Sequence, residues 1–195
     1  MSTKNKLSLT LRPAMIHECL VVAEEYNKFK DWSQVREEVL GNNLLQARTE
    51  STLKTIYGEV SKRLKNLTDA ELALMNYSES DAQHLVWLAI CREYLFTRQF
   101  AVEVLSGYFD KSRFQLYSED YDAFLNAKAE WHENLDNITQ KSRYKSQQIM
   151  FKMLVECGLA TKNKEILHQN LSPQVKAVIV EKNPDDLAIF PGEYH

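Results

Sequence analysis

Glycine and proline, the residues that most often interrupt regular structure, are scarce in this chain. Its 195 residues include five glycines and four prolines. A sandwich or barrel of short strands needs many tight turns, and these residues are preferred in them. Apolar residues instead recur at helical spacing; Leu53, Ile56 and Val60, for example, share one face of a helix. The sequence therefore predicts an all-α protein built as a multi-helix bundle.

Capping signals divide the chain into separate helices. Pro13 suits a first helical turn, where its missing N–H is not needed. Thr68 with Glu71, and Ser80 with Gln83, have the spacing of capping boxes. The helix after Ser80 is apolar almost all round, which predicts a place at the buried centre. The expected helices span about 13–28, 33–40 (with Ser33 as its N-cap), 49–67 and 139–157, and others begin at Thr68, Ser80, Ser118 and Ser172.

The character of the sequence changes between Gly107 and Ser118, where a polar link interrupts the apolar pattern. We place a domain boundary there. The expected units are an N-terminal helical bundle (1–112), a smaller C-terminal helical domain of helix-turn-helix type (113–182), and a weakly structured acidic tail (183–195).

Composition excludes several classes of protein. With 24 basic and 27 acidic residues the formal charge is −3, so the chain is not a globally basic polyanion binder, although a local basic surface remains possible. Three widely spaced cysteines in apolar stretches indicate reduced, buried thiols. The most apolar window, 85–105, contains four charged residues, and each is costly inside a membrane. We expect a soluble, cytoplasmic protein without membrane association.

Motifs for catalysis, cofactors and metals are missing from the sequence. There is no glycine loop followed by a Walker lysine and no dinucleotide fingerprint. The five histidines lack metal-ligand spacing. Each cysteine occupies an apolar helical position, where a thiol behaves as a small hydrophobe. We expect no enzyme activity, no cofactor and no metal site.

Charge is segregated in the C-terminal half. Six acidic residues and one lysine lie between Tyr117 and Asp136, whereas six basic residues and one glutamate lie between Lys141 and Lys164. Cations, hydroxyls and amides at the start of a helix suit contacts with phosphates and base edges. A solvated basic helix face would have the same composition. The candidate DNA-binding residues here are Lys141, Arg143, Lys145, Gln148, Lys152, Lys162 and Lys164.

A second basic segment lies in the N-terminal half. Five cations and two glutamates occur between Leu44 and Leu67. Glu59 precedes Arg63 by four residues, so the two can pair along the helix instead of binding a ligand. The candidate DNA-binding residues of this segment are Arg48, Lys54, Lys62, Arg63 and Lys65.

The run DWSQVREEVLGNNLLQARTESTLKTIYGEVSKRLKNL, residues 31–67, resembles the BrxA family of bacteriophage-exclusion (BREX) defence systems. QHLVWLAICREYLFTRQFAVEVL, residues 83–105, and DYDAFLNAKAEWHENL, residues 120–135, fit the same pattern. The resemblance implies an all-helical fold related to NusB-type RNA-binding factors. It also implies a role in phage resistance beside a methyltransferase and other BREX components, with binding to nucleic acid, DNA in particular. No catalytic motif of the family transfers to residues of this chain.

Together these features predict a non-enzymatic accessory subunit of a BREX complex. We expect it to bind the backbone of double-stranded DNA through basic helices, with weak sequence preference. Two other functions remain open. The opposed acidic and basic segments suit an adaptor that docks onto larger BREX subunits, and the NusB likeness suits RNA binding. The sequence leaves the oligomeric state open.

Overall fold

The computed structural model describes residues 11–130, 135 and 138–193, and within them it confirms the all-α class. The N-terminal half contains α1 (Ile16–Phe29), α2 (Trp32–Gly41), α3 (Glu50–Leu64), α4 (Asp69–Leu74), α5 (Glu79–Glu93) and α6 (Leu95–Phe100), which continues into a π-helix, η2 (Ala101–Ser106), and α7 (Gly107–Phe109). The C-terminal half contains α8 (Ser118–Ala129), α10 (Gln140–Glu156), α11 (Pro173–Lys182) and a 3₁₀ helix, η3 (Pro184–Ile189).

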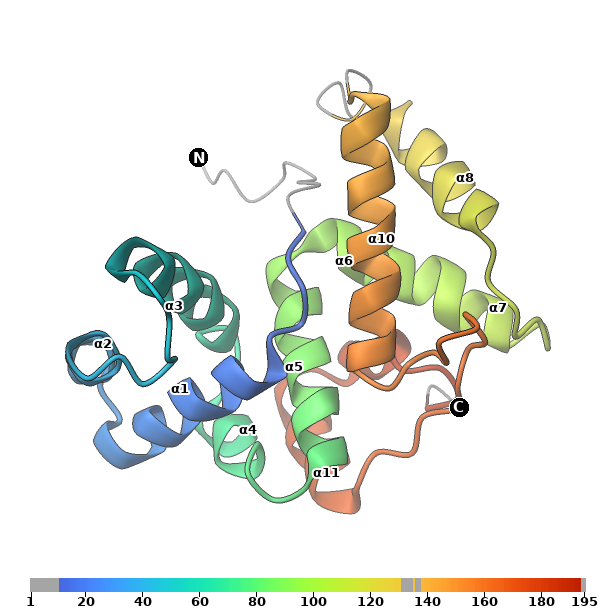
Figure 1. The fold of residues 1–195 in the computed structure, drawn as a ribbon. Coiled ribbons are helices and arrows are strands. Elements are labelled where there is room, and N and C mark those ends of the chain that lie inside the picture. The colour runs from blue at the N-terminus through green and yellow to red at the C-terminus, as the bar shows by residue number, and fades with distance from the viewer. Residues whose placement is uncertain (1–10, 131–134, 136–137, 194–195) are drawn as a thin grey trace.

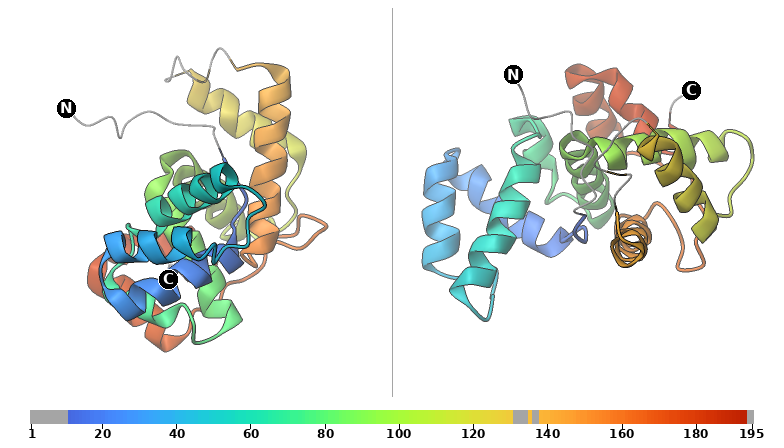
Figure 2. Two further views of the ribbon diagram at one scale, coloured as in Figure 1. Left: turned by 60° about the vertical axis from the view of Figure 1, so that its left-hand side comes forward. Right: turned by 90° about the horizontal axis from the view of Figure 1, so that it is seen from above.

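Helix α5 forms the centre of the molecule, with α1 to α4 on one side and α8 and α10 on the other (Figures 1 and 2). Its residues from His84 to Cys91 are all buried, as expected for a helix that is apolar all round. α1 packs against α2, α3, α4 and α5 and so closes the N-terminal side. None of the helices that the structure describes is long and apolar enough to cross a membrane.

An aromatic cluster connects the central helices with α8. Phe96 and Phe100 of α6 meet Phe124 of α8 with ring centroids 5.1 and 5.3 Å apart, near the edge-to-face geometry that aromatic pairs favour. Tyr121 packs beside them. The buried core is therefore continuous across residue 112. The division into units at this residue stays a prediction.

The expectation of a weakly structured tail is wrong for residues 184–193. Ile189 and Phe190 are fully buried, and the indole N–H of Trp87 donates to the Ile189 carbonyl at 3.1 Å. Asp186 forms ion pairs with Arg92 and Arg98. The acidic composition of the segment concealed these anchors, because Asp186 has partly buried arginines as partners and an apolar pair, Ile189 and Phe190, follows it. Residues 194–195 lie outside the described residues.

Four helix starts differ from the expected ones. α1 begins at Ile16, after a left-handed Met15, and Pro13 lies outside it, where the carbonyls of Pro13 and Ala14 accept hydrogen bonds from Arg63. Asp31 caps α2 instead of Ser33, and Ser78 caps α5 instead of Ser80. In both places a second short polar side chain lies two residues earlier, and the helix begins after that one. Ser118 is the first residue of α8 rather than its cap, and the backbone N–H of Tyr117 donates to an Asp120 carboxylate oxygen. The Thr68–Glu71 capping box is confirmed.

Candidate nucleic-acid interface

Helix α10 (Gln140–Glu156) lies within the predicted range of residues 139–157. The Thr139 side chain accepts a hydrogen bond from the Ser142 N–H, and Gly158 has the left-handed φ of 70° that suits a residue just beyond a helix. There is no acidic residue in the first turn, where Lys141 lies instead. A cation at this end opposes the helix dipole by a few tenths of a kcal/mol or more. A bound anion would relieve that conflict.

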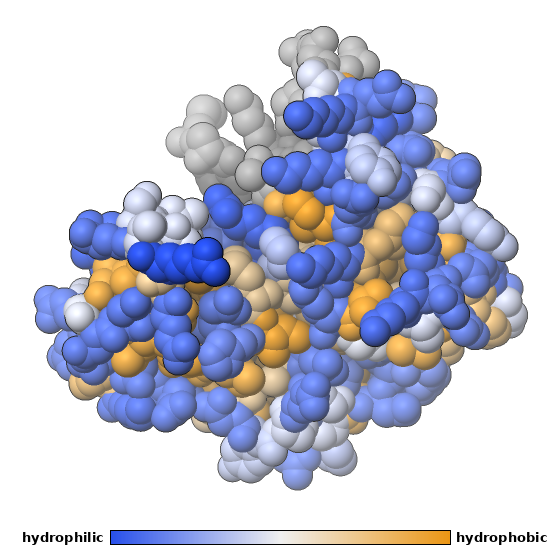
Figure 3. Space-filling view, viewed as in Figure 1, coloured by the Kyte–Doolittle hydropathy of each residue, from blue (hydrophilic) through white to orange (hydrophobic). Residues whose placement is uncertain are grey.

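Four of the candidate residues form one exposed stripe along α10, which we call the α10 stripe: Lys141, Lys145, Gln148 and Lys152. Their spacing of four, three and four residues puts them on a single helix face. At about 1.5 Å per residue the stripe is roughly 16 Å long. Lys152 contacts Glu156 at 3.5 Å, whereas Lys141 and Lys145 form no ion pair with the carboxylates that the structure describes. Figure 3 shows hydrophilic side chains gathered along this helix.

Arg143 and Lys164 point elsewhere, against expectation. Arg143 donates to Asn126 Oδ1 at 2.7 Å and lies 3.7 Å from Asp122, so its charge holds α10 against α8. Lys164 donates to the Ser118 hydroxyl at 3.1 Å, with its ammonium 4.6 Å from the centre of the Phe151 ring. Both are half-buried and tie elements together. Lys162, two residues before Lys164, is exposed.

Most cations on α3 have local partners. Lys54 pairs with Glu50, and Lys62 pairs with Glu93 at 2.7 Å while lying over the Tyr94 ring. The Lys65 ammonium is 5.4 Å from the centre of the Trp32 ring. These side chains remain exposed, as does Arg48 just before the helix. Their charge is therefore less available to an external anion than that of the α10 stripe.

The placement of Arg63 on this basic surface is wrong, because its side chain is completely buried. Its guanidinium donates to the carbonyls of Pro13 and Ala14, at 2.8 and 3.0 Å, and to that of Arg12. Glu59 neutralises it at 2.8 Å. Arg63 thus fastens the extended segment before α1 to α3. A signal was present, since Arg63 follows the buried Val60 by three residues and so lies on the apolar face.

Two exposed side chains near these surfaces were missing from the candidate set. Tyr144 is 60% exposed and follows Lys141 by three residues, so it borders the α10 stripe. The side chain of Arg12 is 46% exposed and contacts Glu59 at 3.8 Å. The spacing of Tyr144 could have identified it from the sequence. Arg12 precedes the first helix and carried no periodic signal.

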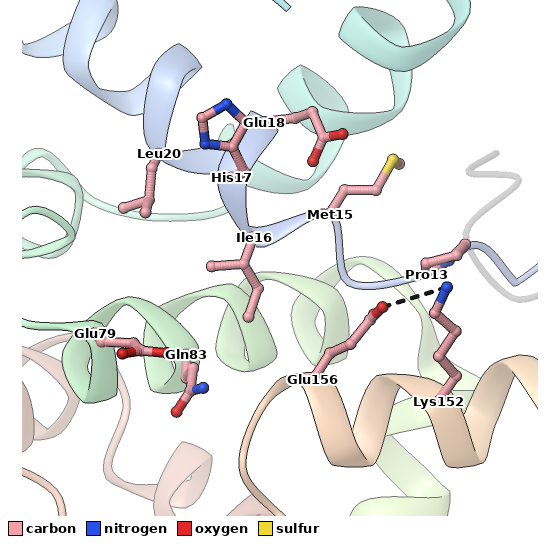
Figure 4. Close-up of a pocket in the computed structure, with 10 residues that line it drawn as sticks. All are labelled: Pro13, Met15, Ile16, His17, Glu18, Leu20, Glu79, Gln83, Lys152 and Glu156. Atoms are coloured by element: carbon pink, nitrogen blue, oxygen red, sulfur yellow. Dashed lines mark ion pairs between the residues drawn. The ribbon is translucent and has the colours of Figure 1, made fainter.

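A cleft of about 690 Å³ separates the basic surface of α10 from the N-terminal half. Pro13, Met15, Ile16 and Leu20 supply its apolar lining, with charged side chains at the rim (Figure 4). Glu156 crosses one edge and accepts the Ala14 N–H at 2.8 Å. Lys152 belongs both to this rim and to the α10 stripe. Apolar surface is visible in the hollow beside α10 in Figure 3.

The cysteines pack as hydrophobes. All three are free and buried. Burial raises the pKa of Cys19 to about 12, and it also raises the pKa values of Cys91 and Cys157. Thiolates are the reactive form of cysteine, so these thiols are unreactive in the folded protein. Within the described residues no group of three or more His, Cys, Asp or Glu side chains could hold a metal ion.

Comparison with known proteins assigns the chain. A family model described as BrxA matches residues 4–183. The chain belongs to the BrxA family. Its relatives in this family include the BREX protein BrxA of Escherichia coli O9:H4 (strain HS), 25% identical over 185 residues that cover 93% of this chain and 87% of that protein. The BREX protein BrxA of Bacillus cereus (strain H3081.97) is 26% identical over 155 residues, covering 78% and 77% respectively.

As a BrxA-family member, the chain is a BREX phage-defence protein. An uncharacterized protein from Magnetospirillum magneticum, known from a crystal structure, has a similar fold, with a TM-score of 0.79 and 18% identity. The match covers 98% of this chain and 100% of that one. At this identity the likeness concerns the fold alone. The BrxA match includes the α10 stripe and ends at residue 183, just before η3.

Proposed function

We propose that this BrxA-family protein is a non-catalytic subunit of its BREX system that binds double-stranded DNA through the α10 stripe. The observation that carries the proposal is the pair Lys141 and Lys145, which is exposed at the start of a helix and has no ion-pair partner among the described carboxylates. Phosphate contacts of this kind are independent of sequence. Gln148, between the lysines of the stripe, has the amide donor and acceptor that match adenine.

The packing of α10 supports a helix-turn-helix role for the C-terminal unit. Tyr121 and Ser146 share a hydrogen bond of 2.6 Å, and Gln147 donates to the Ser118 carbonyl at 2.9 Å. These contacts hold one face of α10 on α8 and leave the opposite face, with the stripe, free. A recognition helix lies in the major groove with such a free face and contacts bases near its N-terminus. For the N-terminal helices we keep a NusB-like arrangement as part of the proposal.

A charge-reversal experiment tests the α10 stripe. The variant Lys141→Glu/Lys145→Glu should bind a 20-base-pair duplex roughly tenfold or more weakly in fluorescence anisotropy. The slope of log K against log salt should flatten by about 0.9 for each lost phosphate contact. Glutamate in the first turn favours the helix dipole, so the variant should keep its thermal stability. Arg143 is left unchanged because it holds α8, and replacing it would confuse loss of binding with loss of structure.

The matched control reverses two exposed lysines elsewhere, Lys111→Glu/Lys182→Glu, with the same change in net charge. It should bind DNA nearly as well as the wild type. Equal weakening by both double variants would mean that net charge alone governs binding. Unchanged binding by the α10 variant would remove α10 from the proposal. A single-stranded RNA that competes better than the duplex would favour the RNA-binding alternative.

The cleft supports a second candidate function, that of an adaptor for larger BREX subunits such as the methyltransferase. Its apolar lining and its acidic side chains Glu18 and Glu79 suit a protein partner better than they suit DNA. The two functions are compatible, because the cleft and most of the α10 stripe are separate. Purified protein without measurable DNA binding at low salt would leave the adaptor as the preferred function.

A further inference from the structure

Residues 159–167, directly after α10, form a small β-hairpin. Ala160 and Ile166 are bridged antiparallel, and the Leu167 N–H donates to the Leu159 carbonyl at 2.9 Å. The Thr161 N–H donates to the Glu165 carbonyl at 2.9 Å. The hairpin therefore folds back on itself around a tip at residues 161–164.

A third extended segment completes the arrangement. Gln115, in the link before α8, is bridged antiparallel to Glu165. The Ile166 N–H donates to the Phe114 carbonyl at 2.7 Å, and the Leu116 N–H donates to the Lys164 carbonyl at 2.9 Å. The chain thus runs from a short extended segment through α8 and α10 into a hairpin that pairs with that same segment. α8, α10 and the hairpin form one connected unit.

One side of the hairpin tip is attached to the rest of the protein, and the other side is exposed. Lys164, the last residue of the tip, has a left-handed φ of 63° and contacts the Ser118 hydroxyl of α8 and the Phe151 ring of α10. The Gln115 amide donates to the Asn163 carbonyl at 2.9 Å. Lys162 is exposed at the end of the tip, without an ion-pair partner among the described residues. Glu165 is the exposed carboxylate nearest in sequence.

We propose that this hairpin is a wing whose tip, through Lys162, contacts the minor-groove edge of the duplex beside the major groove that α10 occupies. The inference rests on the proposed DNA binding. The Lys164 ammonium lies 4.6 Å from the centre of the Phe151 ring, and Phe151 is next to Lys152 in the sequence, so the wing starts beside the C-terminal end of the α10 stripe. In a duplex bound along the stripe, the phosphate backbone between the occupied major groove and the adjacent minor groove would lie at the wing tip. Cations at minor-groove edges gain from the strong negative potential there, most of all where A·T pairs narrow the groove.

The experiment compares three single variants in anisotropy titrations with an A·T-rich duplex. Lys162→Gln should bind about three- to tenfold more weakly than wild type and lose about 0.9 from the salt slope, as expected for one phosphate-edge contact. Lys145→Gln gives the fold-change in affinity and the change in salt slope for one lysine of α10. Lys182→Gln, at an exposed lysine at the end of α11, is the matched control.

A second measurement assigns the groove. Filling the minor groove of the duplex with netropsin should weaken binding by the wild type, Lys182→Gln and Lys145→Gln alike, and should weaken binding by Lys162→Gln clearly less. If Lys162→Gln binds like Lys182→Gln while Lys145→Gln is impaired, the wing is overturned and DNA binding by α10 stands. If netropsin weakens all four proteins equally, the minor-groove contact is overturned. If the wild type binds no duplex, the proposed function fails first, and the wing fails with it.

Discussion

Neighbouring residues of the same charge have opposite roles in this protein. Lys62 is exposed and pairs with Glu93, whereas Arg63, the next residue, is buried beneath the segment before α1. A count of charged residues in the sequence does not distinguish Lys62 from Arg63. The direction of each side chain depends on its helix face and on a segment fifty residues away that supplies three carbonyls. The helix face could be predicted from the sequence, but the long-range partners could not.

A buried histidine gives the fold an acid-sensitive residue. Burial lowers the pKa of His84, although its bond with Gln169 acts in the opposite direction. In an unfolded chain a histidine takes up a proton near pH 6.5. As the pH falls through that value, the unfolded state binds the proton before the folded state does, so the free energy of unfolding decreases.

We therefore expect wild type to lose more stability between pH 7.5 and 5.5 than His84→Asn, measured by urea unfolding at both values. His84→Asn should be less stable than wild type at pH 7.5 because it loses packing against Phe190. His17→Asn, at an exposed histidine, is the matched control for replacing an imidazole outside the core. Equal losses in wild type and His84→Asn would assign the acid sensitivity to other groups.

At the scale of elements, the sequence was sufficient where the signal is local. The Thr68–Glu71 box, the Gly158 end of α10 and the Ser172–Pro173 start of α11 follow from short-range hydrogen bonding and are confirmed. It was insufficient where two caps compete, as at α2 and α5. It also missed the hairpin after α10, because its own pairing is limited to a few residues and its third segment, at Gln115, lies far away in sequence.

The cap of α2 offers a direct test of the competing pair. Asp31 Oδ1 accepts the N–H groups of Ser33 and Gln34 at 2.6 and 3.1 Å. Asp31→Ala should lower the free energy of unfolding by about 1 kcal/mol, the usual cost of losing an N-cap. Ser33→Ala, the matched control inside the helix, should change it by less than about 0.5 kcal/mol. Urea unfolding measures both, and the reverse order would restore Ser33 as the cap.

Across the whole molecule, η3 connects the C-terminal end of the described residues to the central helix α5. Asp186 is 2% exposed and lies between Arg92, at 2.9 Å, and Arg98. Arg92 also pairs with Glu71 of α4 at 2.7 Å. One buried network therefore joins α4, α5, α6 and η3. Its members are spread from residue 71 to residue 186, so no local sequence pattern indicates that the segment after Pro184 is anchored.

Removing one charge from this network should destabilise the protein as a whole. Asp186→Asn keeps the shape of the side chain but removes the carboxylate that Arg92 and Arg98 share. Arg92 keeps Glu71 as a partner and the Arg98 side chain is 25% exposed, so the cost should fall below the roughly 3–5 kcal/mol of a fully buried pair that is broken. We expect a single cooperative transition at a clearly lower Tm in thermal unfolding followed by circular dichroism. The exposed neighbour variant Asp185→Asn should unfold close to wild type. A wild-type Tm for Asp186→Asn would mean that η3 is attached by its apolar contacts alone, and that the charges add nothing to the closure.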